Sequence, residues 1–313
     1  MTSYETLKVE IGTDRVGLIT MNRPDALNAM NTAMMRELRD LFMSFYVDEG
    51  QAACLVLTGS GTRGFCTGAD LKERKGMTDA TWRRQHAVVE QMVRAIMDCP
   101  IPVIAAVNGH AYAGGMEIAL ACDFVYAAEH ARFALTEVTL GIMPGAAGTQ
   151  NLPRAVGVRR AKEIILTGNP FSAADALAWG MVNAVHSGGT LLDAAIHRAW
   201  IFKLGRLPSH GRVAHFLCET ELRLRAVGLS DGARFELPLT QADLAEVCGL
   251  TSVHVNRVLR ELRERGLVTL RDGNVDVHDG AGLARLGEFD PRYLYLDEAA
   301  VPAVGVRPRR SHV

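Results

Sequence analysis

Two glutamates of the first half could do chemistry because each lies among apolar residues. Glu117 lies in the first turn of the apolar segment MEIALAC, and Glu137 lies in the segment FALTEVTLG. A carboxylate in such surroundings pairs, acquires a raised pKa or faces a polar cavity. Two of them can hold a water molecule, one accepting its proton while the other donates a proton to carbon. The alternative is a helix-dipole partner at 117 and a surface acid at 137.

Two glycine-rich segments are the second candidate for chemistry. They are GFCTGAD at 64–70 and NGHAYAGGME at 108–117, and each follows a predicted strand and leads into a helix. Glycines allow the backbone to approach a ligand closely, and the first amides of a helix have no internal acceptor. Two amides from the two segments could therefore converge on one oxygen and stabilise negative charge on it, as an oxyanion hole does. The alternative is that both segments are tight structural turns.

The elements that position these residues alternate between strands and helices. Short apolar runs at 15–21, 54–58 and 103–107 predict buried strands. Apolar residues spaced by three and four predict helices at 31–46 and 80–97. This alternation predicts an α/β unit with helices packed over a sheet.

The second half has a different pattern, in which helices dominate. Thr240 with Asp243 three residues on forms a variant of the capping box, so a helix should begin there. Gly249 ends it, Thr251 or Ser252 caps a second helix as far as Gly266, and segments 267–270 and 275–278 flank a turn sequence. The pattern predicts helix, tight turn, helix and a small hairpin or wing. We expect a disordered tail at 297–313.

Composition excludes several classes of protein. The chain has 313 residues and a formal net charge of -1, so bulk charge does not hold it on nucleic acid or an anionic membrane. Its six cysteines lie far apart without a CxxC pair, which predicts no metal site and suits a reducing compartment. Without a leader-like N-terminus or a long apolar run, a cytoplasmic protein is expected. Of the 16 basic residues after position 200, 15 are Arg, which suits contacts with phosphate and guanine but also follows from a high-GC genome.

Residues from about 8 to 195 resemble the enoyl-CoA hydratase/isomerase (crotonase) superfamily. Four motifs carry the resemblance in order: NRPDALNAM at Asn22, GFCTGADLKE at Gly64, PVIAAVNGHAYAGGMEIALACD at Pro102 and FALTEVTLGIMPGAAGTQNLPRAVG at Phe133. The resemblance implies an acyl-CoA substrate, a role in fatty acid metabolism and no cofactor, since CoA is part of the substrate. It implies a crotonase-like ββα spiral core, for which we define a domain at 1–193. The helices that normally follow, which cover the acyl pocket and join subunits, are expected to be missing after the first.

The resemblance also assigns roles to individual residues. The oxyanion donors fall on the amides of Ala69 and Gly114, and the two catalytic glutamates fall on Glu117 and Glu137. Having both glutamates favours a hydratase, a carbon–oxygen lyase, over the family's other reactions. Gly145 would lie near the bound water. The residues whose backbone would line the CoA arm are Ala26, Leu27, Thr67, Asp70, Leu71 and Lys72.

Residues from about 194 to 296 resemble the C-terminal part of Crp/Fnr-type transcription regulators. The motifs are RVAHFLCE at Arg212, RFELPLTQADLAEVCGLTSVHVNRVLRELRERGLV at Arg234 and FDPRYLYL at Phe289. The resemblance implies an α+β winged helix-turn-helix domain at 194–296 that binds double-stranded DNA, with the first domain joined inside a shared helix at 194–203. The second helix would enter the major groove. Its candidate DNA-binding residues are Thr251, Ser252, Val253, His254, Arg257 and Arg260, with Arg263 also over phosphate; an ordinary solvated, salt-bridged helix face is the alternative.

Three functions of different classes remain open from the sequence. The first is an enoyl-CoA hydratase with an appended DNA-binding module. The second is a transcription regulator whose crotonase part senses acyl-CoA without turnover. The third is a fusion in which neither activity is retained. The first is preferred, and a homo-oligomer is expected, because regulators of this type place two helices on a two-fold DNA site.

Overall fold

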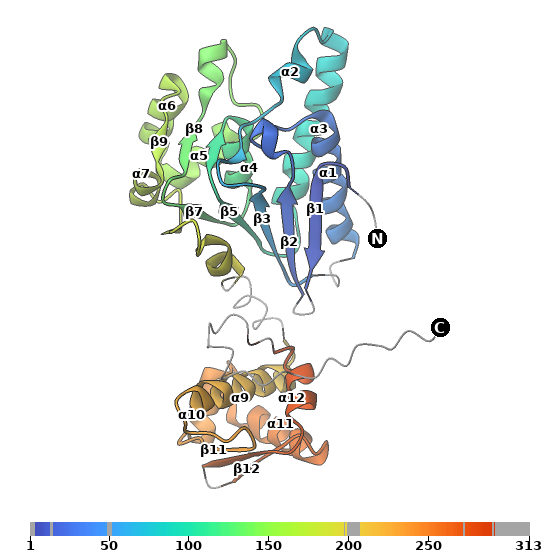
Figure 1. Ribbon diagram of the computed structural model, residues 1–313, viewed down its shortest axis with the longest axis vertical. Helices are drawn as coiled ribbons and strands as arrows, with labels where there is room; N and C mark the ends of the chain where they lie inside the picture. Colours follow the sequence, from blue (N-terminus) through green and yellow to red (C-terminus); the bar gives the residue numbers. More distant parts are fainter. Residues whose placement is uncertain are drawn as a thin grey trace, which may run out of the picture. The chain divides into compact units, whose positions relative to one another are not determined.

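A six-stranded sheet lies at the centre of the first of two units, residues 1–203 and 204–313, into which the chain divides (Figure 1). The computed structural model describes residues 4–12, 15–48, 52–196, 198, 207–271, 273–289 and 291. The first two strands pair antiparallel and the other neighbours pair parallel. The strands, in their order across the sheet, are β1 (Leu7–Ile11), β2 (Val16–Met21), β3 (Cys54–Gly59), β5 (Val103–Val107), β7 (Phe124–Ala128) and β10 (Ala184–His186).

Both faces of this sheet are buried. Successive side chains of a strand point to opposite faces, so each strand contributes to two cores. One face, with Leu55 and Leu57, joins the main core beneath helices α1 (Thr32–Val47) and α3 (Asp79–Met97). The other face, with Cys54 and Val56, packs against Leu191 and Ala195. The three strands and two helices predicted for this region are confirmed, with ends that differ by at most one residue.

Helical residues 191–196 cover the second face of the sheet. Besides the apolar contacts of Leu191 and Ala195, the Arg198 Nε donates to the Tyr126 hydroxyl at 2.7 Å. The predicted shared helix at 194–203 lies partly outside the described residues, since 197 and 199–206 are not among them. A domain boundary between 193 and 194 therefore stays a prediction.

A smaller second sheet carries the two glycine-rich segments. Strands β4, β6 and β8 run parallel, so their carboxyl ends lie at one edge, and β9 adds an antiparallel strand. Segments 67–70, 113–117 and 135–137 leave from that edge. The strands are β4 (Gly64–Cys66), β6 (His110–Tyr112), β8 (Arg132–Ala134) and β9 (Phe171–Ser172). The helices around this sheet are η1 (Pro24–Ala26), α2 (Leu71–Arg74), α4 (Gly114–Ala121), η2 (Thr136–Leu140), α5 (Gly148–Val156), α6 (Val158–Thr167) and α7 (Ala173–Ala178).

The second unit is a helical domain with a three-stranded antiparallel sheet and its own core. Its helices are α9 (Ser209–Ala226), α10 (Gln241–Val247), α11 (Ser252–Glu264) and α12 (Gly280–Leu286). The sheet order is β11 (Arg234–Glu236), β13 (Asn274–Val277) and β12 (Val268–Arg271). The predicted helix-turn-helix and hairpin are confirmed, whereas β11 was not predicted because only one of its three side chains is buried. The expected disordered tail, 297–313, lies outside the described residues.

The contact between α4 and β4 gives a stability prediction. A Cβ atom on Gly115 would lie 1.9 Å from the Cys66 carbonyl oxygen, whereas one on Gly189 meets nothing within 4 Å. We expect Gly115→Ala to lower the free energy of unfolding of the first unit by about 1–3 kcal/mol, because the backbone of β4 must shift. Urea unfolding measures the change. The matched Gly189→Ala should unfold as the unsubstituted protein does, and equal midpoints for both variants would contradict the packing described.

Candidate functional site

The turn after β4 directs the backbone amide of Ala69 away from Met30, which pairs with it. Met30 pairs with Ala69 in an isolated parallel bridge, in which the Met30 amide donates to the Gly68 carbonyl and the Asp70 amide donates to the Met30 carbonyl. These bonds measure 2.8 and 2.9 Å. Because both flanking peptide groups bond toward Met30, the amide of Ala69 points to the opposite side. Met30 had no role in the sequence interpretation.

The second turn brings the Gly114 amide beside the first. Gly114 begins α4, so its amide is one of the helix's first donors, which lack an intrahelical acceptor. The preceding Ala113 has φ of 48°, a positive value that a non-glycine residue rarely adopts and that often occurs at functional sites. A Cβ atom on Gly68 would lie 3.1 Å from the Gly114 nitrogen. The two predicted donor turns are therefore in contact.

Glu117 is buried and held by backbone amides. Its side chain is 2% exposed, and Oε1 accepts hydrogen bonds from the amides of Ala146 and Gly148, both at 2.8 Å. These amides lie at the start of α5, where helix donors have no partner of their own. Burial raises the pKa of Glu117, and the amides of Gly148, Ala146 and Gly145 oppose that rise. One oxygen is thus fixed, and a Cβ atom on Gly114 would lie 3.9 Å from the other, Oε2.

Glu137 is also buried, but one of its two carboxylate oxygens lacks such support. It lies in η2, its residue is 6% exposed, and its Oε2 has no hydrogen-bond partner among the described residues. Burial raises the pKa of Glu137 to about 7, and the charge of nearby Glu117 adds to the rise. Glu137 is therefore not a surface acid. The two carboxylates are neighbours in different environments, which is the usual means of giving two acids different protonation states.

The residues expected along the CoA arm come from two adjacent segments. Ala26 ends η1, Leu27 follows with φ of 49°, and the Thr67 hydroxyl lies 3.5 Å from the Leu27 carbonyl oxygen. Asp70 caps α2, accepting from the amides of Lys72 and Glu73, and pairs with Arg23 at 2.9 Å. Leu71 begins α2 and is 57% exposed. The structure thus brings the predicted set together next to the Ala69 turn.

Gly145 belongs to the turn that holds Glu117. A Cβ atom on it would lie 2.9 Å from Cε1 of His86, a side chain of α3 that stacks on Trp82 at 5.0 Å. Sequence reasoning missed the amides of Ala146 and Gly148. Residue types gave no sign that a glutamate 29 and 31 positions earlier would accept from these two amides.

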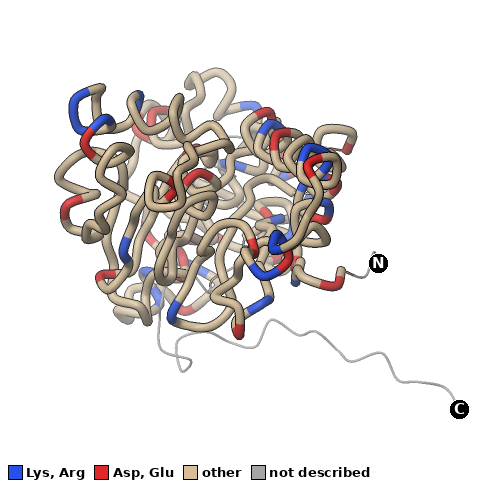
Figure 2. The backbone as a smooth tube through the Cα atoms, turned by 90° about the horizontal axis from the view of Figure 1, so that it is seen from above, with Lys and Arg blue, Asp and Glu red and all other residues tan. Residues whose placement is uncertain are grey.

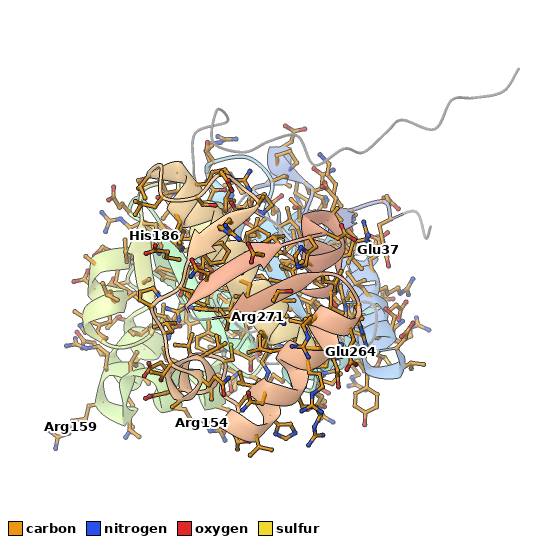
Figure 3. The ribbon with its side chains drawn as sticks, turned by 90° about the horizontal axis from the view of Figure 1, so that it is seen from below. Glu37, Arg154, Arg159, His186, Glu264 and Arg271 are labelled. Atoms are coloured by element: carbon orange, nitrogen blue, oxygen red, sulfur yellow. The ribbon has the colours of Figure 1, made fainter. Side chains whose placement is uncertain are left out.

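The predicted DNA-binding residues lie on one exposed helix surface. The buried side of α11 is formed by Val255, Val258 and Leu262. Thr251 caps the helix by accepting the His254 amide at 3.3 Å, so its hydroxyl has a structural task as well. Figure 3 labels Glu264 at the end of α11 and Arg271 on the hairpin beside it. All six predicted side chains are exposed: Thr251, Ser252, Val253, His254, Arg257 and Arg260.

Neither the distribution of charged residues nor the hydropathy of the helices adds evidence for a function of either site. Figure 2 shows lysine and arginine interspersed with aspartate and glutamate, without a large area of one sign in this view. Within the described ranges, no helix is long and apolar enough to cross a bilayer. In the same ranges, no three His, Cys, Asp or Glu residues gather as a metal-binding group.

The first unit thus combines an α/β core with two buried glutamates and two turns that lead into helices. The enoyl-CoA hydratase/isomerase family profile matches residues 12–211, and the Crp-like helix-turn-helix domain profile matches residues 211–286. The chain therefore belongs to the enoyl-CoA hydratase/isomerase family and carries a Crp-like helix-turn-helix domain. Both predicted resemblances are confirmed.

Individual relatives agree with this assignment. A probable enoyl-CoA hydratase of Rhizobium meliloti is 40% identical over 77% of this chain and 90% of its own length. A crotonyl-CoA hydratase of Syntrophomonas wolfei is 34% identical over 79% of this chain and 90% of its own. The crystal structure of enoyl-CoA hydratase from Bacillus anthracis matches with a TM-score of 0.63 and 33% identity, covering 83% of this chain and 93% of that one. The predicted crotonase-like fold is thereby confirmed.

The raised pKa of Glu137 predicts a pH-dependent stability. Its pKa is about 7 in the folded protein against an ordinary 4.5, so between these values the folded state binds more protons than the unfolded chain. Stability contributed by this proton is present below pH 4.5 and is lost as the pH rises through 7. We expect the urea midpoint to fall from pH 5 to pH 8 by less in Glu137→Gln than in the unsubstituted protein. Replacing the exposed Glu129 by Gln should leave the slope unchanged; identical slopes in all three proteins would argue against the buried environment.

Proposed function

We propose that the first unit catalyses the addition of water to a 2-enoyl-CoA. The observation that carries the proposal is that Glu117 and Glu137 are both buried, that their charges interact, and that Glu117 lies beside Gly114. Relatives named enoyl-CoA hydratase and crotonyl-CoA hydratase support the substrate class. Acyl-CoA would lie along the segments at 26–27 and 67–72.

In this mechanism the amides of Ala69 and Gly114 bind the thioester oxygen. Water bonds to the β-carbon, the electron pair of the double bond moves toward the thioester, and the enolate oxygen becomes negative. Glu117, whose Oε1 is fixed by two amides, accepts a proton from the attacking water through Oε2. Glu137, whose pKa of about 7 leaves it partly protonated at neutral pH, donates a proton to the α-carbon. The product is a 3-hydroxyacyl-CoA, and no cofactor enters the balance.

Replacing either glutamate tests the catalytic proposal. We expect Glu137→Gln and Glu117→Gln each to lower kcat for crotonyl-CoA hydration by about 10²–10⁴-fold, because each removes a proton-transfer group. The assay follows the loss of absorbance of the conjugated thioester. The exposed Glu129→Gln is the matched control and should retain kcat. Full activity in Glu137→Gln would rule out the assigned role.

We propose DNA binding as the second function, because the exposed surface of α11 combines donors with an apolar side chain at its N-terminal end. Val253 is 72% exposed and can contact a thymine methyl group, and Arg257 is one turn further along. Arg260 and Arg263 extend the same exposed helix toward phosphate groups. The Crp-like domain match supports this assignment. Two copies of the chain would place two such helices on a two-fold site.

The base-contacting role of Arg257 is testable once an operator has been selected from random duplexes. A bidentate arginine–guanine contact contributes about 1–3 kcal/mol of discrimination, so Arg257→Gln should weaken operator binding roughly 5- to 150-fold and relax preference at one base pair. Arg285→Gln, an exposed arginine on α12, is the control. Fluorescence anisotropy at fixed salt measures both. A uniform loss on specific and random DNA would assign Arg257 to phosphate instead.

The two activities separate the remaining alternatives. A protein that senses acyl-CoA without turnover would change its operator affinity when crotonyl-CoA is added. Its Glu137→Gln variant would show the same change. A fusion without either activity would neither hydrate crotonyl-CoA nor select an operator. We propose that the protein is an active hydratase. A change of operator affinity caused by crotonyl-CoA would require binding of the thioester but not its turnover.

A further inference from the structure

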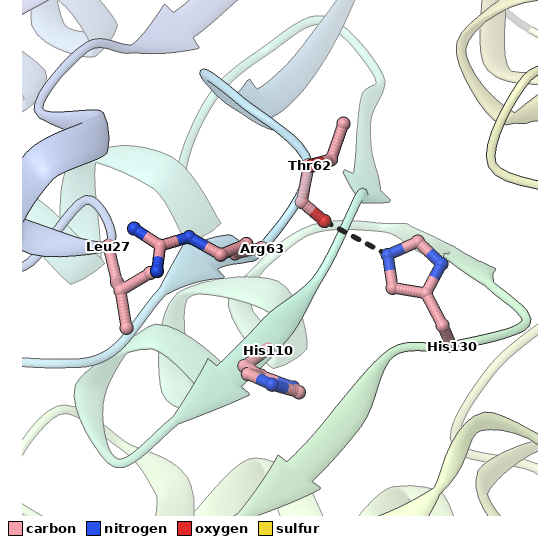
Figure 4. A pocket seen from close by; sticks show the side chains of 5 residues that line it. All are labelled: Leu27, Thr62, Arg63, His110 and His130. Atoms are coloured by element: carbon pink, nitrogen blue, oxygen red, sulfur yellow. Dashed lines mark hydrogen bonds between the residues drawn. The ribbon is translucent and has the colours of Figure 1, made fainter.

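A pocket lies apart from the proposed thioester site. Its volume is about 530 Å³, and the residues that line it are Leu27, Thr62, Arg63, His110 and His130 (Figure 4). Arg63 directly precedes β4, His110 begins β6, and His130 lies in the turn before β8. Three strands of the second sheet therefore present their amino ends to this pocket.

The direction of these strands separates the pocket from the proposed active site. β4, β6 and β8 are parallel and three residues long, and the segments with Ala69, Gly114 and Glu137 leave from their carboxyl ends. At ~3.3 Å per residue the two ends lie ~10 Å apart. Leu27 is the lining residue that is also expected along the CoA arm, so the test below includes competition by CoA.

The lining of the pocket suits an anion. Arg63 has a permanent positive charge on an exposed side chain, two further lining residues are histidines, and none of the five is acidic. A guanidinium presents paired N–H donors that match the oxygens of a phosphate group. The pocket therefore favours a phosphate over a neutral or cationic group.

The two histidines are held in place before any ligand binds. His130 Nε2 lies 3.0 Å from the Thr62 carbonyl oxygen, and because a carbonyl only accepts, the ring nitrogen donates (Figure 4). This bond ties the loop before β4 to the turn before β8. The His110 ring stacks on Tyr112 at 5.3 Å with planes 7° apart. Its Nδ1 is buried and has no hydrogen-bond partner among the described residues, so a hydrogen bond to a ligand would come from the other ring nitrogen, Nε2.

We propose that this pocket binds the phosphate of a small phosphorylated metabolite other than the acyl-CoA substrate. Arg63 would hold the phosphate oxygens by paired hydrogen bonds, and the ring of His110 would donate a further one. The volume exceeds that of a phosphate ion and lies within the ~300–1,000 Å³ of small-molecule sites, so the ligand carries an organic group. Leu27 offers that group an apolar contact. The proposal goes beyond hydration and stands even where the hydratase assay fails.

Calorimetric titration of the full-length protein tests phosphate recognition. The probes are inorganic phosphate, adenosine 5′-monophosphate and adenosine. We expect both phosphate-bearing probes to bind with one site per chain and adenosine to bind at least tenfold more weakly than the monophosphate. Arg63→Gln and His110→Phe should each weaken binding of the monophosphate at least tenfold, whereas Arg159→Gln, an exposed arginine of α6, should not. Absence of binding, or unchanged affinity in Arg63→Gln, would overturn the proposal.

Competition with CoA distinguishes a separate metabolite from the phosphorylated end of the substrate. A separate site keeps its affinity for adenosine 5′-monophosphate when CoA is saturating, and Arg63→Gln then leaves the KM for crotonyl-CoA unchanged. Displacement of the monophosphate by CoA, together with a raised KM in Arg63→Gln, would assign the pocket to the CoA arm and refute a separate ligand. Calorimetry measures binding of the monophosphate without turnover. Its failure can therefore be distinguished from a failure of the hydration assay.

Discussion

The hydrogen bonds from the Ala146 and Gly148 amides to Glu117 are the interaction on which the rest of the first unit's site depends. A carboxylate with 2% exposure needs such partners, because burying an unpaired charge costs far more than one hydrogen bond returns. The same bonds satisfy amides at the start of α5 that a helix cannot satisfy itself. One contact thus fixes the orientation of a side chain on α4 and the position of the helix that follows it.

Glu137 shows what burial does when one carboxylate oxygen has no hydrogen-bond partner among the described residues. Its pKa rises to about 7, so its proton is retained at a pH where an exposed glutamate has lost it. The difference between the two acids arises from backbone geometry, since both have the same side chain. Close packing of Gly68 against Ala113 and of Gly115 against Cys66 keeps the amide-bearing turns beside this pair. The positions of the two glutamates and of the two turns therefore depend on how the loops pack at the carboxyl ends of three short strands.

The sequence predicted the elements well where their residue types are local signals. Thr240 and Asp243 form the reciprocal capping box that their spacing indicated, and the periodic segments at 31–46 and 80–97 are helices. Long motifs identified both families and the candidate glutamates. The partners of Glu117, the bridge from Met30 to Ala69 and the strand at 234–236 were not predictable. Each depends on backbone groups brought together across 20 or more positions, and a backbone amide leaves no signature in residue type.

One face of the central sheet is covered by helical residues 191–196 and by Arg198. Leu191 and Ala195 fill the face formed by alternate residues of β3, β5 and β7, and Arg198 ties the segment to Tyr126. That face is therefore covered by residues of the first unit itself. Because these apolar side chains of the sheet are covered within their own unit, their shielding from water does not depend on where the second unit lies.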